Sequence, residues 1–383
     1  MSINQQKNTS QNPNSIRELP ADEPLGVLEP VVYFNEAMPT GVTVSQQGRI
    51  FVNFPKWGDD IQFTVAEIKN GNAVAYPDEV FNQTDPDDLA KALVSVQSVV
   101  VDPMDRLWIL DTGSPLFQPT KYGGPKMVCV NLTNDQVVKK ILFPQDVAFP
   151  TTYLNDVRFD LRRGSEGMAF ITDSSQKGPN GIIVVDLASG ESWRRLNDHP
   201  STKPEKLQTF LPIVEGRPFL EHQSDGSVKQ GASMGSDGIA ISEDGSRLYY
   251  CPLGSRKLYS VDTDALADRS FDERKVVDTV TDEGDKGGAA DGLESDATGY
   301  IYSTNYEHNS VLRRHRNGEE WETVVHDPRL LWPDTLSVAA DGYLYVMANQ
   351  LYRQARYQKG HDLRHKPYTL FRVHINSSPV LLR

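Results

Sequence analysis

Short apolar runs alternate along the chain with clusters of Gly, Pro, Asp and Asn. The runs are rich in Val, Ile, Leu, Tyr and Phe, and many alternate apolar with polar positions, which is the period of a half-buried β-strand. Helical periodicity is weak and is confined to residues 86–95. The pattern therefore predicts an all-β fold.

One module recurs along the sequence in six copies. Each copy opens on a polar residue, usually followed by Gly or another small residue, continues as an alternating strand, and turns into a second strand, commonly through Asp-x-Gly. The copies are PTGVTVSQQGRIFVNF from Pro39, VQSVVVDPMDRLWILDTG from Val96, LNDVRFDLRRGSEGMAFITDSS from Leu154, SDGIAISEDGSRLYYCPLGSRKLYSVD from Ser236, ADGLESDATGYIYSTNYEHNSVLRR from Ala290 and PDTLSVAADGYLYVMANQLYR from Pro333. Intervals of roughly 40 to 80 residues fit four-stranded blades with variable loops, so the sequence predicts a six-bladed β-propeller.

The two ends of the chain are expected to differ in kind. Residues 1–24 are polar and too poor in apolar groups to offset the entropy of ordering, which predicts a disordered N-terminal tail. Residues 25–383 are expected to form one propeller domain. Strands predicted at residues 26–34 and 368–375 should share the closing blade, which would leave the circle of sheets without an open edge.

Composition narrows the function. The formal charge of -13 and the absence of a basic stripe argue against nucleic acid as a partner. No apolar run approaches the roughly 20 residues of a membrane helix, and the first residues lack the apolar core of a secretory signal, so we expect a cytoplasmic protein without a membrane partner. Cys129 and Cys251 lie in separate apolar runs and are interpreted as small core residues.

The residues that open the six modules carry the candidate chemistry. The innermost strand of each propeller blade begins beside the central channel, so these openings should form one ring, and they are Thr40, Gln97, Asn155, Asp237, Asp291 and Asp334. Carboxylates gathered in a channel of low dielectric repel one another, and a cation relieves that repulsion. Oxygen ligands without His or Cys favour calcium among divalent metals. Taken singly, an Asp before Gly is also common turn chemistry, and a local cap is the alternative for each aspartate.

Several runs resemble the major royal jelly protein and Yellow family, among them LWILDTG, LNDVRFD, GIIVVDLASGESWRRL and DGIAISEDGSRLYYCPLGSRKLYSV. More distantly, the module openings resemble those of the regucalcin and gluconolactonase group of calcium-dependent lactonases. That resemblance implies metal ligands at Asn155, Asp237 and Asp291, with Asp291 also serving as general base. The sequence departs from the lactonase pattern at Thr40, where that group has Glu, and at Asp237, where it has Asn.

The predicted ligand is a small polar molecule. Its hydroxyl groups are expected to meet polar side chains around the metal, namely Thr40, Gln97, Asp156, Asn305, Tyr306 and Asp334. Three functions stay open on the sequence: metal-dependent hydrolysis of a lactone or related cyclic ester, isomerisation or tautomerisation of a small metabolic intermediate, and ligand binding without turnover. No Gly-x-Ser-x-Gly elbow and no phosphate-binding loop competes with these hypotheses.

Overall fold

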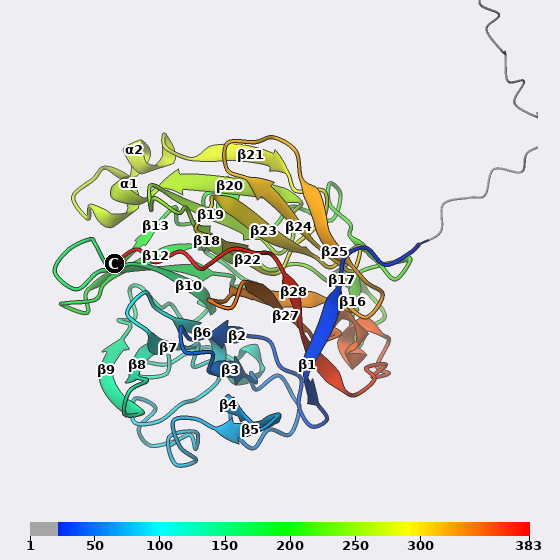
Figure 1. Ribbon diagram of the computed structural model, residues 1–383, viewed down its shortest axis with the longest axis horizontal. Helices are drawn as coiled ribbons and strands as arrows, with labels where there is room; N and C mark the ends of the chain where they lie inside the picture. The colour runs from blue at the N-terminus through cyan, green and yellow to red at the C-terminus, as the bar shows by residue number, and fades with distance from the viewer. Residues whose placement is uncertain (1–21) are drawn as a thin grey trace, which may run out of the picture.

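The computed structural model describes residues 22–383, and in this part of the chain six four-stranded antiparallel sheets stand around a common axis (Figure 1). The predicted six-bladed β-propeller is confirmed. Residues 1–21 of the predicted tail lie outside the described residues. From the innermost strand outward, the blades are β2 (Val42–Val44), β3 (Ile50–Asn53), β4 (Val65–Lys69) and β5 (Asn72–Ala75); β6 (Val96–Val101), β7 (Arg106–Asp111), β8 (Lys126–Asn131) and β9 (Gln136–Leu142); β10 (Leu154–Asp160), β11 (Met168–Asp173), β12 (Gly181–Asp186) and β13 (Ser192–Arg195); β18 (Ser236–Ile241), β19 (Arg247–Pro252), β20 (Lys257–Asp262) and β21 (Thr281–Asp285); β22 (Leu293–Ser295), β23 (Tyr300–Asn305), β24 (Ser310–His315) and β25 (Glu322–His326); and β26 (Pro333–Val338), β27 (Tyr343–Ala348), β28 (Tyr368–His374) and β1 (Leu28–Phe34).

Short elements decorate this frame. Two small hairpins follow the third blade, and the fourth blade carries two helices of five residues each. These elements are β14 (Ile213–Val214), β15 (Arg217–Pro218), β16 (Leu220–His222), β17 (Val228–Gln230), α1 (Thr263–Ala267) and α2 (Glu273–Val277), with 3₁₀ turns η1 (Pro115–Phe117), η2 (Pro200–Thr202), η3 (Leu351–Arg353) and η4 (Ala355–Tyr357). None of the helices in residues 22–383 is long and apolar enough to cross a membrane.

The first and last strands of the described chain close the ring. β1 pairs antiparallel with β28, from Leu28 opposite Val373 to Phe34 opposite Tyr368, and forms the outer edge of the sixth blade. Figure 1 shows the blue β1 alongside β28, near the red end of the colour range. The predicted sharing of one blade by the two ends is therefore confirmed, and the ring is closed by backbone hydrogen bonds between distant parts of the sequence.

Turn chemistry at the hairpins follows the sequence prediction. Asp244 and Asp296 accept hydrogen bonds from backbone N–H groups two residues further on, at 2.9 Å in each case. Gly245 and Gly299, which complete these turns, have φ values of 73° and 90°. These are left-handed conformations in which a side chain would be strained, so glycine is needed there.

The weak helical periodicity at residues 86–95 does not correspond to a helix, in agreement with the predicted all-β fold. The segment forms a series of turns followed by an extended approach to β6. The carboxylate of Asp85 accepts from the N–H groups of Asp87 and Asp88, and that of Asp88 accepts from Ala90. Aspartate side chains thus take the backbone donors that a helix would use, and turns win over the helical period.

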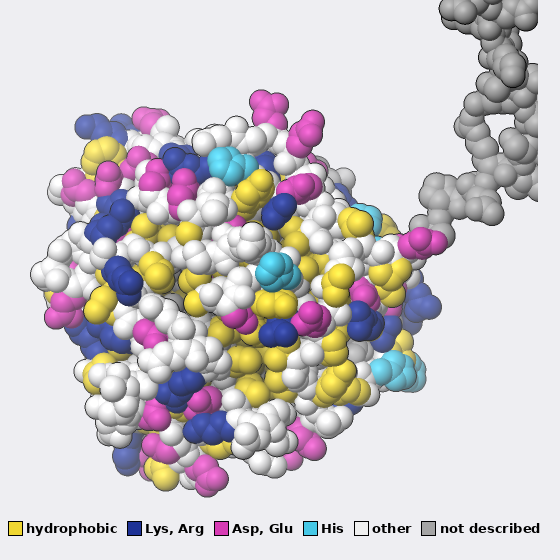
Figure 2. All heavy atoms as spheres, viewed as in Figure 1, with side chains coloured by type: hydrophobic (Ala, Val, Ile, Leu, Met, Phe, Trp, Pro, Cys, Tyr) yellow, Lys and Arg dark blue, Asp and Glu magenta, His cyan; other side chains and the backbone are white. Residues whose placement is uncertain are grey.

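Apolar side chains pack between neighbouring blades rather than in one central core. Cys129 lies between the second and third blades among Trp108, Leu154 and Phe159, and Cys251 is fully buried in the fourth. Both cysteines are free and buried, as predicted for small core residues. On the face drawn in Figure 2, acidic and basic side chains are interspersed among apolar ones.

One end of the central channel is covered by the last residues of the chain. A small cavity of about 70 Å³ is bounded there by side chains from all six innermost strands and by Pro379, Val380 and Leu381. The covering segment is held by hydrogen bonds from Ala297 N to Ser378 O and from Leu161 N to Leu382 O, each 2.9 Å long. Figure 1 shows this red segment running across the blades towards β12. The ring of module openings therefore lies at the other end of the channel.

Closure of the ring predicts which core substitutions lower the free energy of unfolding most. Leu370 on β28 is fully buried between the sixth and first blades, and Leu370→Ala should lower the free energy of unfolding by about 2–5 kcal/mol. Val138→Ala on β9, where the side chain is 54% exposed, should change it by less than about 0.5 kcal/mol. Urea denaturation of the two variants checks this, and equal stabilities would contradict it.

Candidate functional site

Irregular backbone at the start of the inner strands directs the predicted residues towards the channel. Four of the six inner strands lose their regular register with the second strand at the module opening. Such bulges turn a side chain away from the direction that regular pairing would give it. The residues skipped by the regular pairing are Gln97, Asn155 with Asp156, Asp237 with Gly238, and Asp334 with Thr335.

Glycine follows the polar opening of the fourth and fifth modules because neighbouring blades approach closely there. A Cβ atom on Gly238 would lie 2.6 Å from the carbonyl oxygen of Asp291, and one on Gly292 would lie still closer to the carbonyl oxygen of Asp334. A side chain at either position would push adjacent inner strands apart. The Asp-Gly pairs of the fourth and fifth modules therefore mark convergence on the channel, and a local turn cap does not account for them.

Three aspartates from successive blades form a buried carboxyl cluster, which consists of Asp237, Asp291 and Asp334. Their exposed fractions are 3%, 8% and 4%. The side chains of Asp237 and Asp291 hydrogen-bond to each other, and the charge of Asp291 reaches both other carboxyls. Trp332 Nε1 donates to Asp291 at 2.6 Å, and Asn349 Nδ2 donates to Asp334 at 2.6 Å. Sequence reasoning thus selected three side chains that the fold gathers.

Burial separates the pKa values within the cluster. Desolvation, followed by the charge of Asp291, raises the pKa of Asp237 and of Asp334 well above the ordinary value. Desolvation also raises the pKa of Asp291, but hydrogen bonds from Trp332 and Asp237 limit the rise to about 6. Burial and the neighbouring charges thus favour the protonated forms of Asp237 and Asp334, and in the hydrogen bond between Asp237 and Asp291 the donor is Asp237 and the acceptor is Asp291. An acid and a base stand side by side.

Asn155 belongs to the neighbouring third blade. Its Nδ2 donates to Ser174 Oγ at 2.8 Å, which leaves the amide oxygen as the remaining side-chain acceptor, and its exposed fraction is 7%. Thr172 of the same blade donates to the carbonyl oxygen of Asp237 at 2.7 Å, so the third and fourth blades are tied together beside the cluster.

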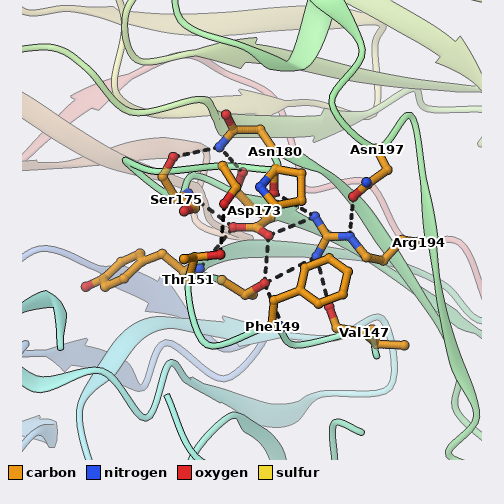
Figure 3. Close-up of polar contacts among 12 residues, drawn as sticks. Val147, Phe149, Thr151, Asp173, Ser175, Asn180, Arg194 and Asn197 are labelled. Carbon is orange, nitrogen blue, oxygen red and sulfur yellow. Dashed lines mark hydrogen bonds and ion pairs between the residues drawn. The ribbon is translucent and has the colours of Figure 1, made fainter. Parts of the chain in front are cut away.

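A buried ion pair holds the segment that leads into β10 (Figure 3). Asp173 accepts hydrogen bonds from Tyr153 N at 2.9 Å, from Thr152 Oγ1 at 3.0 Å and from Arg194 at 2.9 Å. Arg194 also donates to the carbonyl oxygen of Val147 and lies 4.7 Å from the ring centre of Phe149. The backbone immediately before Asn155 is therefore fixed by the end of the second strand of its own blade.

Gln97 is joined to two aromatic residues that sequence reasoning missed. Trp57 Nε1 donates to Tyr153 OH at 2.8 Å, and Tyr153 OH donates to Gln97 Oε1 at 2.9 Å. Tyr153 and Trp332 each stand two residues before a polar module opening, in Tyr-Leu-Asn and Trp-Pro-Asp. An aromatic residue two positions before a module opening could have indicated these side chains in the sequence, because that position places a ring beside the channel mouth.

Four predicted ligand contacts are engaged with the protein itself. Thr40 Oγ1 accepts from Asn53 Nδ2 at 2.8 Å, and Asp156 forms a 2.8 Å ion pair with Arg158. Asn305 bonds the backbone of Gly287 and Glu307, and Tyr306 donates to the carbonyl oxygen of Leu253. These interactions make the four residues part of the wall around the channel, and their contact with a ligand stays a prediction.

Aromatic side chains cover the carboxyl cluster. Tyr306 and Trp332 stack with ring centroids 4.1 Å apart and an angle of 8° between the planes. Phe219 lies 5.1 Å from Trp332 and 4.5 Å from Tyr357. The polar ring is thus closed on this side by flat apolar surfaces, and they lower the local dielectric and account for the raised pKa values.

Carboxyl and amide oxygens are the donors that a hard cation prefers, and the metal site at the mouth stays a prediction. Within residues 22–383, no group of three or more His, Cys, Asp or Glu side chains is arranged to hold a metal ion. The predicted metal ligands differ from such a group, because only two of them are carboxyls, those of Asp237 and Asp291, and the third is the amide oxygen of Asn155. A cation there would replace the proton that now relieves the repulsion between the two carboxyls. The first module opens on Thr40 and therefore supplies no carboxylate to the channel mouth. The Thr40 hydroxyl accepts a hydrogen bond from Asn53.

Comparison with known proteins places the chain in a family. The family model for major royal jelly proteins matches residues 94–376. The chain belongs to the major royal jelly protein family. Major royal jelly protein 1 of Apis mellifera is 28% identical over 209 residues, which are 52% of this chain and 43% of the relative. Protein yellow of Drosophila melanogaster is 26% identical over 258 residues, or 64% of this chain and 44% of the relative, so less than half of each relative is matched.

Solved structures show the same architecture at low sequence identity. A luciferin-regenerating enzyme aligns with a TM-score of 0.57 at 10% identity, covering 92% of this chain and 97% of its own. The calcium-binding protein regucalcin from Agrobacterium tumefaciens gives 0.54 at 13% identity, covering 91% and 95%. A gluconolactonase from Xanthomonas campestris gives 0.51 at 13% identity, covering 91% and 88%. The resemblance to the royal jelly and Yellow family is confirmed, and so is the more distant one in fold to the lactonases.

The raised pKa of Asp291 predicts how stability varies with pH. Because the folded protein binds this proton more tightly than the unfolded chain, Asp291 contributes stability at low pH that is lost as pH rises from about 4 to about 6. Each unit of raised pKa corresponds to about 1.4 kcal/mol. Urea denaturation between pH 4 and pH 8 should show a smaller loss in Asp291→Asn than in the unchanged protein, and parallel curves would contradict this.

Proposed function

We propose that this protein is a metal-dependent hydrolase that opens a small lactone or related cyclic ester at the mouth of the channel. The observation that carries the proposal is the pair formed by Asp237 and Asp291, in which Asp291 has a pKa of about 6. A general base works best when its pKa lies near the working pH, and a solvent-exposed aspartate is too weak a base for that role. The shared fold with a gluconolactonase and with regucalcin supports the choice of reaction and of calcium.

Asp237, Asp291 and Asn155 would hold the cation, whose bound form supplies polarisation of the ester carbonyl. Asp291 takes a proton from the attacking water as the oxygen of that water bonds to the carbonyl carbon. The same carboxyl then returns the proton to the ring oxygen when the carbon–oxygen bond breaks, so that one hydroxy acid is formed from one lactone and one water. Trp332 Nε1, 2.6 Å from Asp291, keeps the base oriented during both transfers.

Asp334 has a different part in this site. Burial and the charge of Asp291 raise the pKa of this carboxyl well above the ordinary value, and its protonated form can donate a hydrogen bond to a hydroxyl or carbonyl oxygen of the ligand. Asn349 fixes the other oxygen of the same carboxyl at 2.6 Å. A neutral donor beside an ionised base suits an uncharged polar ligand, because neither group repels it.

A proton should leave when the cation binds. Burial raises the pKa of Asp237 well above the ordinary value in the absence of metal, and coordination requires its carboxylate. Titration with calcium at pH 7 in buffers of different ionisation enthalpy should therefore show release of about one proton per ion bound. Asp237→Asn should weaken binding at least about tenfold and abolish the release. Asp264→Asn, an exposed change on α1, is the matched control, and the absence of binding by calcium or any other divalent ion would refute the metal site.

Loss of the base should remove the activity. Asp291→Asn keeps the shape of the side chain and should lower the rate of lactone opening by about 100- to 10,000-fold. A panel of sugar and aromatic lactones, followed by acid release at constant pH, measures the rate, with Asp264→Asn again as control. The hydrolase would be ruled out if the protein without substitutions opened none of these lactones in the presence of calcium.

The metal-free pair favours a second candidate function. Without a cation, Asp237 is an acid in contact with the base Asp291, and the stacked rings of Tyr306 and Trp332 stand over them. Such a pair can move a proton from one atom of a small intermediate to another, which is isomerisation or tautomerisation. A product of unchanged mass, formed in the presence of a chelator, would identify this activity. Binding that Asp291→Ala weakens, without any turnover, would instead identify a ligand-binding propeller.

A further inference from the structure

A cavity of about 250 Å³ lies outside the ring, between the small hairpins that follow the third blade and the 3₁₀ turns of the sixth. Glu215, Arg217 and Phe219 line it from β14 to β16, and Arg353, Tyr357 and His365 line it from the segment that includes η3 and η4. We call this cavity, defined by these six residues, the vestibule. Its volume is near the lower end of the range for small-molecule sites.

Two layers of aromatic side chains separate the vestibule from the carboxyl cluster. Phe219 and Tyr357 stand in its wall, and Phe219 also contacts Trp332, with ring centroids 5.1 Å apart. Trp332 in turn donates to Asp291 at 2.6 Å. Movement of Phe219 together with the neighbouring rings would connect the vestibule directly with the base.

The element that carries Phe219 is held to the blades by apolar packing of Val214 and Phe219 and by a few polar contacts. It consists of two-stranded hairpins of two or three residues per strand, which have little stability of their own. Glu215 forms an ion pair with Arg353 across the vestibule, and Ile213 N donates to Glu307 at 3.1 Å. These exposed contacts can break without disturbing any of the six sheets.

Charge distinguishes the vestibule from the ring. The channel mouth carries the acidic cluster, whereas the vestibule has two arginines against one glutamate, with an imidazole beside them. Opening a neutral lactone produces a hydroxy carboxylate, which is an anion at neutral pH. Arg217 lines the vestibule, is exposed and forms no ion pair among residues 22–383, so its charge attracts this product.

We propose that the vestibule is the route by which a small hydroxy carboxylate leaves the ring and that Phe219 is the gate of this route. The assignment rests on the hydrolase proposed above. It identifies Arg217 as the cation that receives the carboxylate and Phe219 as the side chain whose displacement sets how fast the ring is reached.

Chemical labelling tests the gate without any turnover. A water-soluble carbodiimide with an amine modifies protonated and accessible carboxyls, and peptide mass spectrometry locates the label on Asp237, Asp291 or Asp334. Phe219→Ala should label severalfold faster than the unchanged protein, and Phe219→Leu, which retains apolar volume, should lie between them. Phe271→Ala, beside the fourth blade, is the control. Unchanged labelling in a folded Phe219 variant, as judged by circular dichroism, would overturn the gate.

Binding of D-gluconate tests the vestibule. Arg217→Gln should weaken gluconate binding, measured by titration calorimetry, by about two- to fivefold, the effect of one exposed charge contact. Arg274→Gln removes the same charge from the exposed surface of α2 and should leave the affinity unchanged. Equal affinities in the two variants would overturn the assignment of Arg217.

The two proposals fail in different ways. Labelling that responds to Phe219 in a protein that opens no lactone keeps the gate and removes the hydrolase. Lactone opening in a protein whose labelling ignores Phe219 keeps the hydrolase and removes the gate. A variant of Phe219 that raises turnover and labelling in parallel supports both, because it shows that passage through the aromatic layer limits the reaction.

Discussion

Circular closure of the six sheets is the constraint on which the rest of this structure depends. The backbone pairing of β1 with β28 joins the two ends of the described chain and fixes each blade at one angle around the axis. Closure also forces the six inner strands to converge, and the convergence leaves no room for a side chain at Gly238 or Gly292. Polar residues on separate stretches of the chain are brought together as a result, although nothing in their local sequence requires it.

Burial of three carboxyls is costly, and the structure offsets the cost in ways that shape the chemistry. One proton shared between Asp237 and Asp291 removes a charge, and hydrogen bonds from Trp332 and Asn349 satisfy carboxyl oxygens. The aromatic cover excludes water and strengthens each of these interactions. Apolar side chains in the same space would often give equal or greater stability, and the cluster therefore supports the proposal of a site for a ligand, a cation or a transferred proton.

Membership of the major royal jelly protein family is a similarity of sequence, whereas the similarity to lactonases is one of fold. The family match rests on sequence from residue 94 to residue 376, whereas the likeness to regucalcin and to a gluconolactonase is one of fold, at 13% identity. Function is decided by the site rather than by the propeller, because one frame supports many activities. In this chain the first module supplies Thr40, bonded to Asn53, and the fourth supplies the carboxyl of Asp237. The carboxyl groups at the channel mouth are thus concentrated on the fourth, fifth and sixth blades.

The sequence by itself determined the number of blades, the strands of the closing blade and the three aspartates of the ring. Strand alternation and module openings are patterns of neighbouring residues, so they can be recognised without the tertiary structure. The weak helical periodicity at residues 86–95 gives no helix, because Asp85 and Asp88 accept hydrogen bonds from backbone donors there. Only the tertiary structure decided which partner each polar side chain binds. Thr40 is hydrogen-bonded to Asn53, Asp156 forms an ion pair with Arg158, and Asp291 accepts a hydrogen bond from Trp332. The different pKa values of Asp237 and Asp291 likewise arise from burial and from contacts between blades, and these depend on distances that local sequence does not encode.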